Sequence, residues 1–238
     1  VITNGTITGR CSHRSPNLGQ VVAKKSPYGK ECRALFHAPY DWDMIGLDAK
    51  ALELRCLAGY LALYDGGEYG KLVINPDVDI HRYNQEQFGV SDREIAKRLI
   101  YAMLYGSGAD KAGTIIDPSE KDPIKLKALG RNAINGFLNG VPALRKLKNK
   151  IEETLNTRGY LIGIDGRALH CRSGFKGLNL LLQSAGGLIM KQVVINIHKN
   201  IEENLELPYG GVWEQLLMVH DEVQLTCNKK YTEEIRNE

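Results

Sequence analysis

The sequence predicts an α+β protein in which a small antiparallel sheet is assembled from distant segments and a helical insertion separates its strands. Three observations indicate this class. Strand-like patterns lie near both ends of the 238 residues, helical patterns fill the middle, and there is no internal repeat or low-complexity tract. Strands that are segregated from helices are typical of α+β folds, whereas strands that alternate with helices are typical of α/β folds.

The beginning of the chain combines turns, one strand and one helix. Residues 1–40 alternate polar and apolar around Asn4-Gly5, a hairpin-turn dipeptide, and then run through Ser-Pro and Pro-Tyr-Gly turns. Residues 44–47 form a short apolar strand that ends at Asp48. Apolar residues at helical spacing predict a helix over 52–61.

Helices dominate the middle of the chain. Asp79 and Ser91 are suitable N-caps for two of them, and acidic residues in the first turn support the second. Gly106 is suited to end that second helix, because glycine readily adopts the left-handed conformation found after helix C-termini. Two further helices are expected at 119–139 and 142–157.

The last part of the chain returns to strands. A hairpin is expected at 159–171, where polar and apolar residues alternate around Asp165-Gly166. A long helix follows at about 176–204. Two strands and a tight turn then complete the pattern: 213–219, then His220, Asp221 and Glu222, then 223–227.

Composition restricts the class of protein. The chain is 43% hydrophobic and 25% charged, as is ordinary for a globular protein. No apolar run approaches the ~20 residues needed to span a bilayer, so we expect no membrane partner. Five widely spaced cysteines lack zinc-site spacing and are typical of reduced thiols in the cytoplasm. Both ends of the chain look cut, which favours a fragment of a longer protein.

Charge is unevenly distributed although the net value is only +3. Residues 1–33 hold six basic side chains and one acidic one, a local +5, and residues 142–176 hold eight and three, again +5. The remainder is therefore 3 − 5 − 5 = −7. Two basic segments on an acidic chain suit a polyanionic partner, although solvated surface patches give the same pattern.

The turn between the last two strands carries unusual residues. V-H-D-E-V lacks the Gly or Asn that tight turns prefer, and it places Asp221 beside Glu222. A solvated hairpin tip would explain it. The alternative is a divalent-metal site, because adjacent carboxylates repel each other unless a cation compensates, and Mg²⁺ prefers hard oxygen ligands.

Two more carboxylates lie where the first strand gives way to a helix. Asp48 either caps that helix or serves as a second metal ligand. Glu53 is placed about one and a half turns into an otherwise apolar helix face, where an unpaired carboxylate is costly. A cost of this kind favours a functional role for Glu53.

A stripe on the helix that follows Ser91 is suited to a nucleoside triphosphate. Its members recur every fourth residue and drift by only about 40° per step: Arg93, Lys97, Tyr101 and Tyr105. Cations can bind the phosphates while aromatic rings pack against sugar and base. The alternative is a partly buried amphipathic stripe whose cations reach out to solvent.

Six motifs occur in an order that resembles family A DNA polymerases. D-x-x-x-x-E-L-R from Asp48, R-x-x-x-K-x-x-x-Y-x-x-x-Y-G from Arg93 and V-H-D-E from Val219 resemble their motifs A, B and C. Three other blocks also match: T-G-R at 8–10, D-G-R at 165–167 and L-N-L-L-L-Q-S-A-G at 178–186. The residues C-L-A after E-L-R, together with Tyr101, resemble the phage branch. The resemblance covers the chain from Thr8 to about Cys227.

This resemblance implies a catalytic set and its cofactor. Asp48 and Asp221 would hold two Mg²⁺ ions, or Mn²⁺, one at the primer 3′-hydroxyl and one at the triphosphate. Glu222 would support the metal site. Lys97 would bind the triphosphate and is also the candidate proton donor to the leaving pyrophosphate.

The resemblance also implies the substrate contacts. Arg93 would bind the β- and γ-phosphates together with Lys97, Tyr101 would stack beside the incoming nucleotide, and Glu53 would crowd the 2′ position of its sugar. Two further residues complete the nucleotide site, Tyr105 near the templating position and His81. Primer–template DNA would be contacted by four residues: Arg10, Asn179, Gln183 and His220.

The implied architecture is a right-hand polymerase fold that lacks the thumb. An antiparallel palm sheet is expected in residues 1–65 and 158–238, with mostly helical fingers in 66–157. The partners would be deoxynucleoside triphosphates and DNA in the cytoplasm of a bacterial or phage-infected cell, with a processivity factor left open. Two alternatives are a single-subunit RNA polymerase, which Glu53 disfavours, and an inactive DNA-binding relative, which the retained aspartates disfavour.

Overall fold

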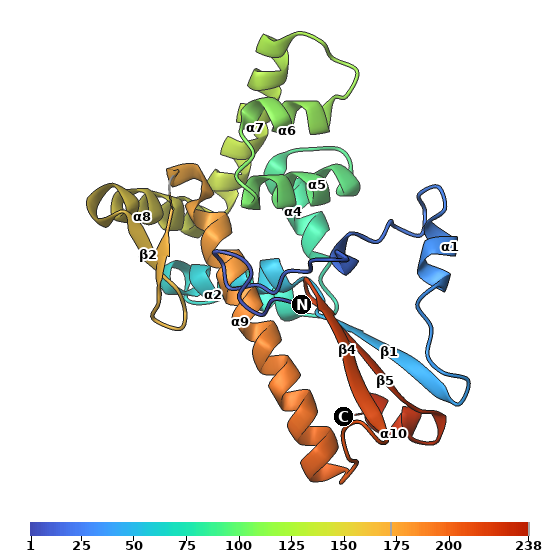
Figure 1. Cartoon of the computed structure of the whole chain (residues 1–238). Coiled ribbons are helices and arrows are strands. Elements are labelled where there is room, and N and C mark those ends of the chain that lie inside the picture. The colour runs from blue at the N-terminus through green and yellow to red at the C-terminus, as the bar shows by residue number, and fades with distance from the viewer. Residues whose placement is uncertain (172, 238) are drawn as a thin grey trace. The chain divides into compact units, whose positions relative to one another are not determined.

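A computed structural model of the chain describes residues 1–171 and 173–237 (Figure 1). The chain divides into two compact units. The first unit joins Val1–Leu52 with Ser184–Glu238, and the second is Glu53–Gln183. The first unit holds a three-stranded antiparallel sheet and the second is mostly helical apart from a two-stranded hairpin, so the α+β class predicted from the sequence is confirmed. The finer division into palm and fingers at residues 65 and 158 stays a prediction.

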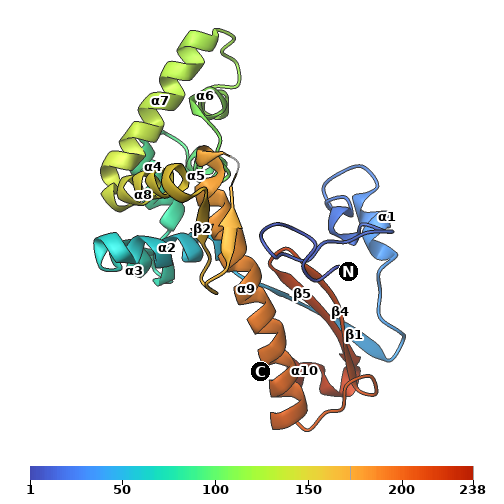
Figure 2. The same ribbon diagram turned by 60° about the vertical axis from the view of Figure 1, so that its left-hand side comes forward.

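The first unit is built on a three-stranded antiparallel sheet with the order β1-β5-β4. Its strands are Trp42–Asp48 (β1), Trp213–Val219 (β4) and Glu222–Asn228 (β5). The central strand is therefore the last one in the chain, and the long β1–β5 ladder pairs Trp42 with Asn228 at one end and Asp48 with Glu222 at the other. Figure 2 shows the three strands side by side.

Apolar side chains and a few buried polar contacts hold the first unit together. Trp213 is fully buried, and its indole Nε1–H donates a hydrogen bond to the Leu207 carbonyl at 3.1 Å. Cys227 is also fully buried on the central strand. From Ser184 on, the long helix α9 (Gly177–Lys199) also belongs to this unit, together with the π-helical turn at Asn200–Asn204. The other elements of the unit are short: a 3-10 turn at Leu18–Gln20, α1 (Gly29–Ala34), a 3-10 turn at Lys229–Tyr231 and α10 (Thr232–Arg236).

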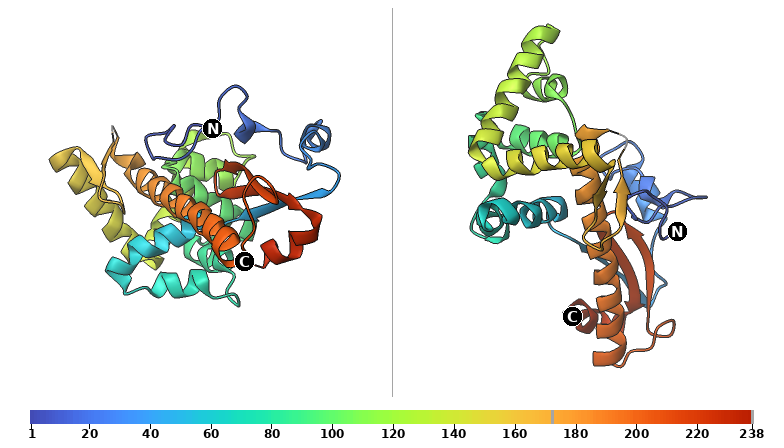
Figure 3. Two further views of the ribbon diagram at one scale, coloured as in Figure 1. Left: turned by 60° about the horizontal axis from the view of Figure 1, so that its bottom comes forward. Right: turned by 90° about the vertical axis from the view of Figure 1, so that its left-hand side faces the viewer.

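The second unit is almost entirely helical. Its elements after α2 (Leu52–Asp65) are α3 (Glu68–Ile74), α4 (Ile80–Phe88), α5 (Arg93–Leu104), α6 (Ala109–Ile116), α7 (Pro123–Gly140), α8 (Pro142–Arg158), the hairpin strands β2 (Tyr160–Ile162) and β3 (Ala168–His170), and a 3-10 turn at Gly174–Lys176. Helix α4 packs against α5 and α7, and α6 packs closely along α7 (Figure 3, right). A Cβ atom on Gly113 or Gly130 would overlap the backbone of the neighbouring helix, so glycine permits this close packing.

Helix boundaries confirm most of the expected end signals. Asp79 caps α4, because its carboxylate accepts hydrogen bonds from the His81 and Arg82 backbone N–H groups. The expected cap at Ser91 is wrong by one residue, since Asp92 accepts from the backbone of the first turn of α5. Ser and Asp are both good caps, and only the backbone path selects between them.

The C-terminal end of α5 follows the expectation closely. Gly106 has a φ of +81°, and its N–H donates to the Met103 carbonyl. The Ser107 N–H donates to the Ala102 carbonyl, which completes a Schellman motif. Helices α3 and α6 were not predicted, because each is short and has a glycine, which offers no capping side chain, at its N-cap position.

The long helix expected at 176–204 is α9 (Gly177–Lys199), continued by a π-helical turn at Asn200–Asn204. Counted from Gly174, this stretch of 31 residues is long and apolar enough to cross a membrane by length and composition alone. The expectation that no segment reaches that threshold is therefore wrong by this criterion. About 44% of the most apolar window is buried inside the protein, and a core helix passes the same test.

Candidate active site

The first unit brings Asp48 and Asp221 to the same end of its sheet. Asp48 is the last residue of β1, and Asp221 lies in the turn between β4 and β5. The Ala49 N–H donates a hydrogen bond to the Asp221 carbonyl at 2.9 Å, which ties the two segments together. Two residues separated by 221 − 48 = 173 positions therefore become neighbours through the β1–β5 register.

The turn that carries Asp221 is tighter than expected. Strand β5 begins at Glu222, which pairs with Val219, so the turn has two residues, His220 and Asp221. His220 has a φ of +56°, in the left-handed region that non-glycine residues seldom adopt. Backbone strain of this kind is often found at functional sites. The turn thus combines residues that tight turns seldom contain with a backbone conformation that histidine seldom adopts.

The two carboxylates suit a hard divalent cation. Neither one makes a hydrogen bond or an ion pair with any residue that the structure describes. Asp48 is exposed and Asp221 is partly exposed. A helix-capping role for Asp48 finds no support, because α2 begins four residues later, at Leu52. The oxygen donors fit Mg²⁺ or Mn²⁺.

Glu222 lies beside this pair and contacts a different neighbour. Cross-strand partners share one face of a sheet, so Glu222 and Asp48 lie on the same face. The Glu222 carboxylate accepts a hydrogen bond from the Gln224 amide. Within the described residues, no group of three or more His, Cys, Asp or Glu side chains forms a possible metal site. A supporting role for Glu222 stays a prediction.

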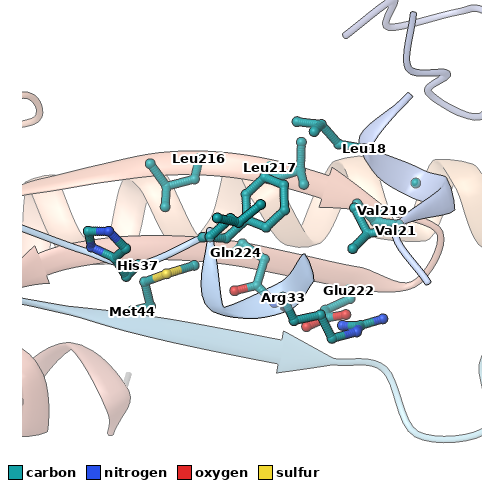
Figure 4. Close-up of a pocket in the computed structure, with 13 residues that line it drawn as sticks. Leu18, Val21, Arg33, His37, Met44, Leu216, Leu217, Val219, Glu222 and Gln224 are labelled. Carbon is teal, nitrogen blue, oxygen red and sulfur yellow. Dashed lines mark hydrogen bonds between the residues drawn. The ribbon is translucent and has the colours of Figure 1, made fainter. Parts of the chain in front are cut away.

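A groove of about 490 Å³ adjoins Glu222 within the first unit. Its walls are mostly apolar and come from residues 18–37 and from the sheet (Figure 4). Arg33 and Glu222 lie at the same end of the groove, with Met44 and His37 toward the other. The groove thus reaches the edge of the carboxylate site without including Asp48 or Asp221.

Two of the four expected DNA-contacting residues meet in the first unit. Arg10 and His220 line one small cavity together with Cys11 and Met218. Arg10 packs on α9 at Gly187, where an added Cβ would lie 3.0 Å from the Arg10 side chain. The other two, Asn179 and Gln183, lie one turn apart on α9, each partly exposed among buried neighbours.

In the second unit, the expected phosphate-binding cations differ in their surroundings. Arg93 forms ion pairs with Asp79 at 2.6 Å and with Glu94 at 2.7 Å. Lys97 is exposed and has no ion-pair partner among the described residues. The sequence offered no signal for the Arg93–Asp79 pair, because it joins two helices. Arg93 is therefore oriented before any ligand binds, whereas the Lys97 amine is not.

Tyr101 and His81 lie together beside these cations. Their ring centroids are 6.2 Å apart, at an interplanar angle of 50°. Burial, followed by the nearby charges of Arg93 and Lys97, lowers the pKa of His81 below its ordinary value of 6.5. His81 is consequently neutral at pH 7. A neutral ring adds a hydrogen-bonding group to the site without adding charge.

Glu53, Tyr105 and Gln183 form a hydrogen-bonded chain. The Gln183 amide donates to Tyr105 Oη at 3.0 Å, and Tyr105 Oη donates to Glu53 Oε1 at 3.1 Å. The expectation that Glu53 lies one and a half turns into its helix is wrong: α2 begins at Leu52, so Glu53 lies in the first turn. A carboxylate is favourable in the first turn of a helix, so the position of Glu53 alone gives no argument for a function. The argument for a functional role of Glu53 rests on its hydrogen bond to Tyr105 instead.

The four-residue stripe is confirmed for three of its members. Arg93, Lys97 and Tyr101 lie on successive turns of α5. Tyr105 comes after the last helical residue, at the C-cap position, with its side chain about half exposed. This position places Tyr105 within reach of Glu53 and Gln183.

Comparison with known proteins extends over the whole chain. The sequence profile of DNA polymerase family A matches residues 1–238. The DNA-directed DNA polymerase of Escherichia phage T7 is 38% identical over an alignment of 255 residues, which covers 98% of this chain and 34% of that protein. The enzyme of Enterobacteria phage T3 is 37% identical with the same coverage. This chain therefore spans about one third of the length of these relatives.

A solved structure has the same fold. The POL domain of Pol1 from M. smegmatis, in complex with DNA primer-template and dNTP, superposes with a TM-score of 0.78. The match covers 99% of this chain and 42% of that chain. Sequence identity is 20%, so this likeness concerns the fold alone.

Proposed function

This chain belongs to DNA polymerase family A, and we propose that it forms the palm and fingers of a template-directed DNA polymerase. In this proposal the complete protein transfers deoxynucleotides from dNTPs to a primer 3′-hydroxyl and releases pyrophosphate. The observation that carries the proposal is the meeting of Asp48 and Asp221 at one end of the sheet, across the β1–β5 register.

The two aspartates are proposed to hold two divalent cations, Mg²⁺ or Mn²⁺. When bound, such cations lower the pKa of a coordinated hydroxyl and neutralise the charge that develops on phosphate oxygens. The chain's own contribution is to hold two carboxylates at a fixed separation on a strand end and a tight turn. Because the turn is tied to Ala49 by a backbone hydrogen bond, the two segments that carry the carboxylates are held next to each other.

The helix α5 is proposed to bind the triphosphate. Arg93, oriented by Asp79, can donate from its remaining guanidinium N–H groups to phosphate oxygens. The exposed Lys97 amine, which no ion pair holds among the described residues, can turn toward charge that develops on the leaving group, which suits it to protonate pyrophosphate. Tyr101 and His81 line the same stretch of helix and would contact the nucleotide.

Sugar selection is proposed to depend on Glu53. Its carboxylate is held by Tyr105, whose ring would lie near the templating position. A carboxylate against the 2′ position leaves no room for a hydroxyl, which favours a DNA polymerase over an RNA polymerase. Arg10, His220, Asn179 and Gln183 are proposed to contact the primer–template. Arg and Gln can read the minor-groove acceptors that every correct base pair presents.

The test is primer extension by the complete protein, with Mg²⁺, dNTPs and a primed template. We expect extension that stops when EDTA removes the metal. Asp48→Ala and Asp221→Ala should each abolish extension and leave primer–template binding within a few-fold of the parent. Asp41→Ala, at the opposite end of the β1 region and exposed, is the matched control. Extension at near-parental rates by either site variant would exclude the two-aspartate metal site.

A further inference from the structure

A buried polar pair lies behind the proposed nucleotide site. Tyr69 on α3 is 3% exposed, and its hydroxyl donates a hydrogen bond to Asn84 Oδ1 at 3.2 Å. Asn84 on α4 is fully buried. Tyr69 is itself fixed, because its backbone N–H donates to Asp65 Oδ2 at 3.1 Å and its ring packs edge-on against Tyr83. The hydrogen bond that Asn84 Oδ1 accepts from Tyr69 therefore fixes the orientation of the Asn84 amide.

Two enclosed nitrogen atoms near this pair lack partners. Asn84 Nδ2 and His81 Nδ1 are both buried and have no hydrogen-bond partner among the described residues. Leaving such groups unsatisfied is costly, and native proteins rarely do so without a reason. The Asn84 atom is a donor, whereas a ring nitrogen of neutral His accepts or donates according to its tautomer.

These two atoms come from residues three apart on one helix. Side chains at i and i+3 share a helix face, with Cβ atoms about 5–6 Å apart. No direct hydrogen bond joins the two atoms, and side chains at this spacing can both reach one intervening water. Buried waters commonly bridge otherwise unsatisfied polar groups in this way.

We propose that Asn84 is a positioning residue for His81. A water molecule held between them accepts from Asn84 Nδ2–H and donates to His81 Nδ1, so that the ring carries its proton on Nε2. The Nε2–H then faces outward as a donor for a triphosphate oxygen. This inference rests on the proposed function, because it assigns a task to His81 within the nucleotide site.

The charged surroundings of His81 agree with a neutral ring. Arg93 and Lys97 oppose its protonation, whereas Asp79 and Glu94 favour it, and burial is the largest influence. A neutral imidazole has two tautomers, and only one presents a donor to a phosphate. Tyr69 and Asn84 select that tautomer from inside the protein. Tyr101, which packs against the same ring, limits its rotation.

The tautomer can be measured without catalysis. Histidine-selective ¹⁵N NMR of the complete protein, with His81→Ala to assign the signal, should show Nδ1 unprotonated and Nε2 protonated near pH 7.5. In Asn84→Asp the new carboxylate accepts a hydrogen bond but cannot donate one. The water then donates to the carboxylate and accepts from His81 Nδ1–H, so that Nδ1 becomes protonated. Asn135→Asp, on the exposed face of α7, is the matched control and should leave the signal unchanged. An unchanged His81 signal in Asn84→Asp would overturn the proposal.

Single-turnover kinetics provides the second readout. Asn84→Ala should raise the dNTP Kd about tenfold, as expected for one lost hydrogen bond to a charged group, with little change in the rate at saturation. In a His81→Ala background the same substitution should have no further effect. Equal effects in both backgrounds would indicate general loosening of α4 and refute the positioning role.

A gentler substitution guards against misfolding. Tyr69→Phe removes one hydroxyl and keeps the ring, so it should act in the same direction as Asn84→Ala but more weakly. Parental dNTP affinity in Tyr69→Phe would exclude Tyr69 as the anchor. If the parent protein failed to extend primers, the proposed function would fail, whereas the tautomer measurement would still decide the role of Asn84.

Discussion

Tyr105 donates a hydrogen bond from its hydroxyl to Glu53 Oε1 at 3.1 Å, across 52 positions of sequence. The Tyr105 oxygen in turn accepts from the Gln183 amide at 3.0 Å. Three side chains that the sequence places on separate helices thereby act as one unit. A flexible glutamate is held in one position by a tyrosine that lies just beyond the end of α5.

Loss of the Glu53 carboxylate should weaken sugar discrimination. We expect Glu53→Ala to raise ribonucleotide incorporation relative to deoxynucleotide incorporation by orders of magnitude, because it opens the space beside the 2′ position. Tyr105→Phe, which removes this hydrogen bond and keeps the carboxylate, should give a smaller rise. The measurement is the ratio of incorporation efficiencies for rNTP and dNTP. Glu68→Ala, an exposed first-turn glutamate on α3, is the control, and an unchanged ratio in Glu53→Ala would show that discrimination lies elsewhere.

Arg93 and Lys97 should affect different kinetic constants. Arg93 is already oriented by Asp79, so Arg93→Ala should mainly weaken dNTP binding. Lys97 lies one turn nearer Tyr101, and its amine is free to follow developing charge, so Lys97→Ala should mainly lower the chemical rate. Single-turnover experiments separate the two constants. Equal effects of both variants on rate and affinity would contradict this division, and Lys111→Ala on α6 controls for loss of a surface cation.

Tyr101 should permit the use of dideoxynucleotides. A dNTP 3′-hydroxyl can hydrogen-bond to a phosphate oxygen, and the Tyr101 hydroxyl can replace that bond when the substrate lacks it. A hydrogen bond to a charged group contributes ~1.5–3 kcal/mol, or roughly ten-fold to over a hundred-fold in efficiency. Tyr101→Phe should therefore lower the ratio of dideoxy to deoxy incorporation at least ten-fold. A parent enzyme that already rejects dideoxynucleotides would remove Tyr101 from the sugar-sensing position.

Asp79 should stabilise the second unit in two separable ways. Its carboxylate caps α4 and pairs with Arg93, and the Arg93 hydrogen bond is the main reason that the pKa of Asp79 lies below its ordinary 3.8. Asp79→Asn keeps a capping side chain and loses the ion pair, which should lower the free energy of unfolding by about 0–1 kcal/mol at this partly exposed site. Asp79→Ala also loses the cap, which should lower the free energy of unfolding by about 0.5–2 kcal/mol more.

The pH dependence separates the two contributions. Because the folded pKa is depressed, the ion-pair contribution is complete above the ordinary value of 3.8 and is lost as the pH falls through the lower, folded value. The difference in unfolding free energy between the parent and Asp79→Asn should therefore shrink in acid, as measured by urea denaturation. A difference that persists unchanged at pH 2 would contradict the ion-pair explanation.

The sequence by itself determined the class of fold and most of the elements, and it supplied the residues of both proposed sites as predictions. Periodicity located the strands at 213–219 and 223–227 and the long helix after 176. Cap chemistry located the start of α4 and the end of α5. These signals are local, since a few neighbouring residues decide a turn, a cap or an amphipathic face. The six sequence motifs are also local, and their order along the chain identified the family.

Only the tertiary structure decided which distant groups meet and how they are oriented. The β1–β5 register brings Asp48 to Asp221, and helix packing pairs Arg93 with Asp79 and Glu53 with Tyr105. No local pattern encodes these pairings, because each depends on how whole elements pack. The same holds for the enclosed nitrogens of Asn84 and His81, whose burial exists only once α3, α4 and α5 have come together.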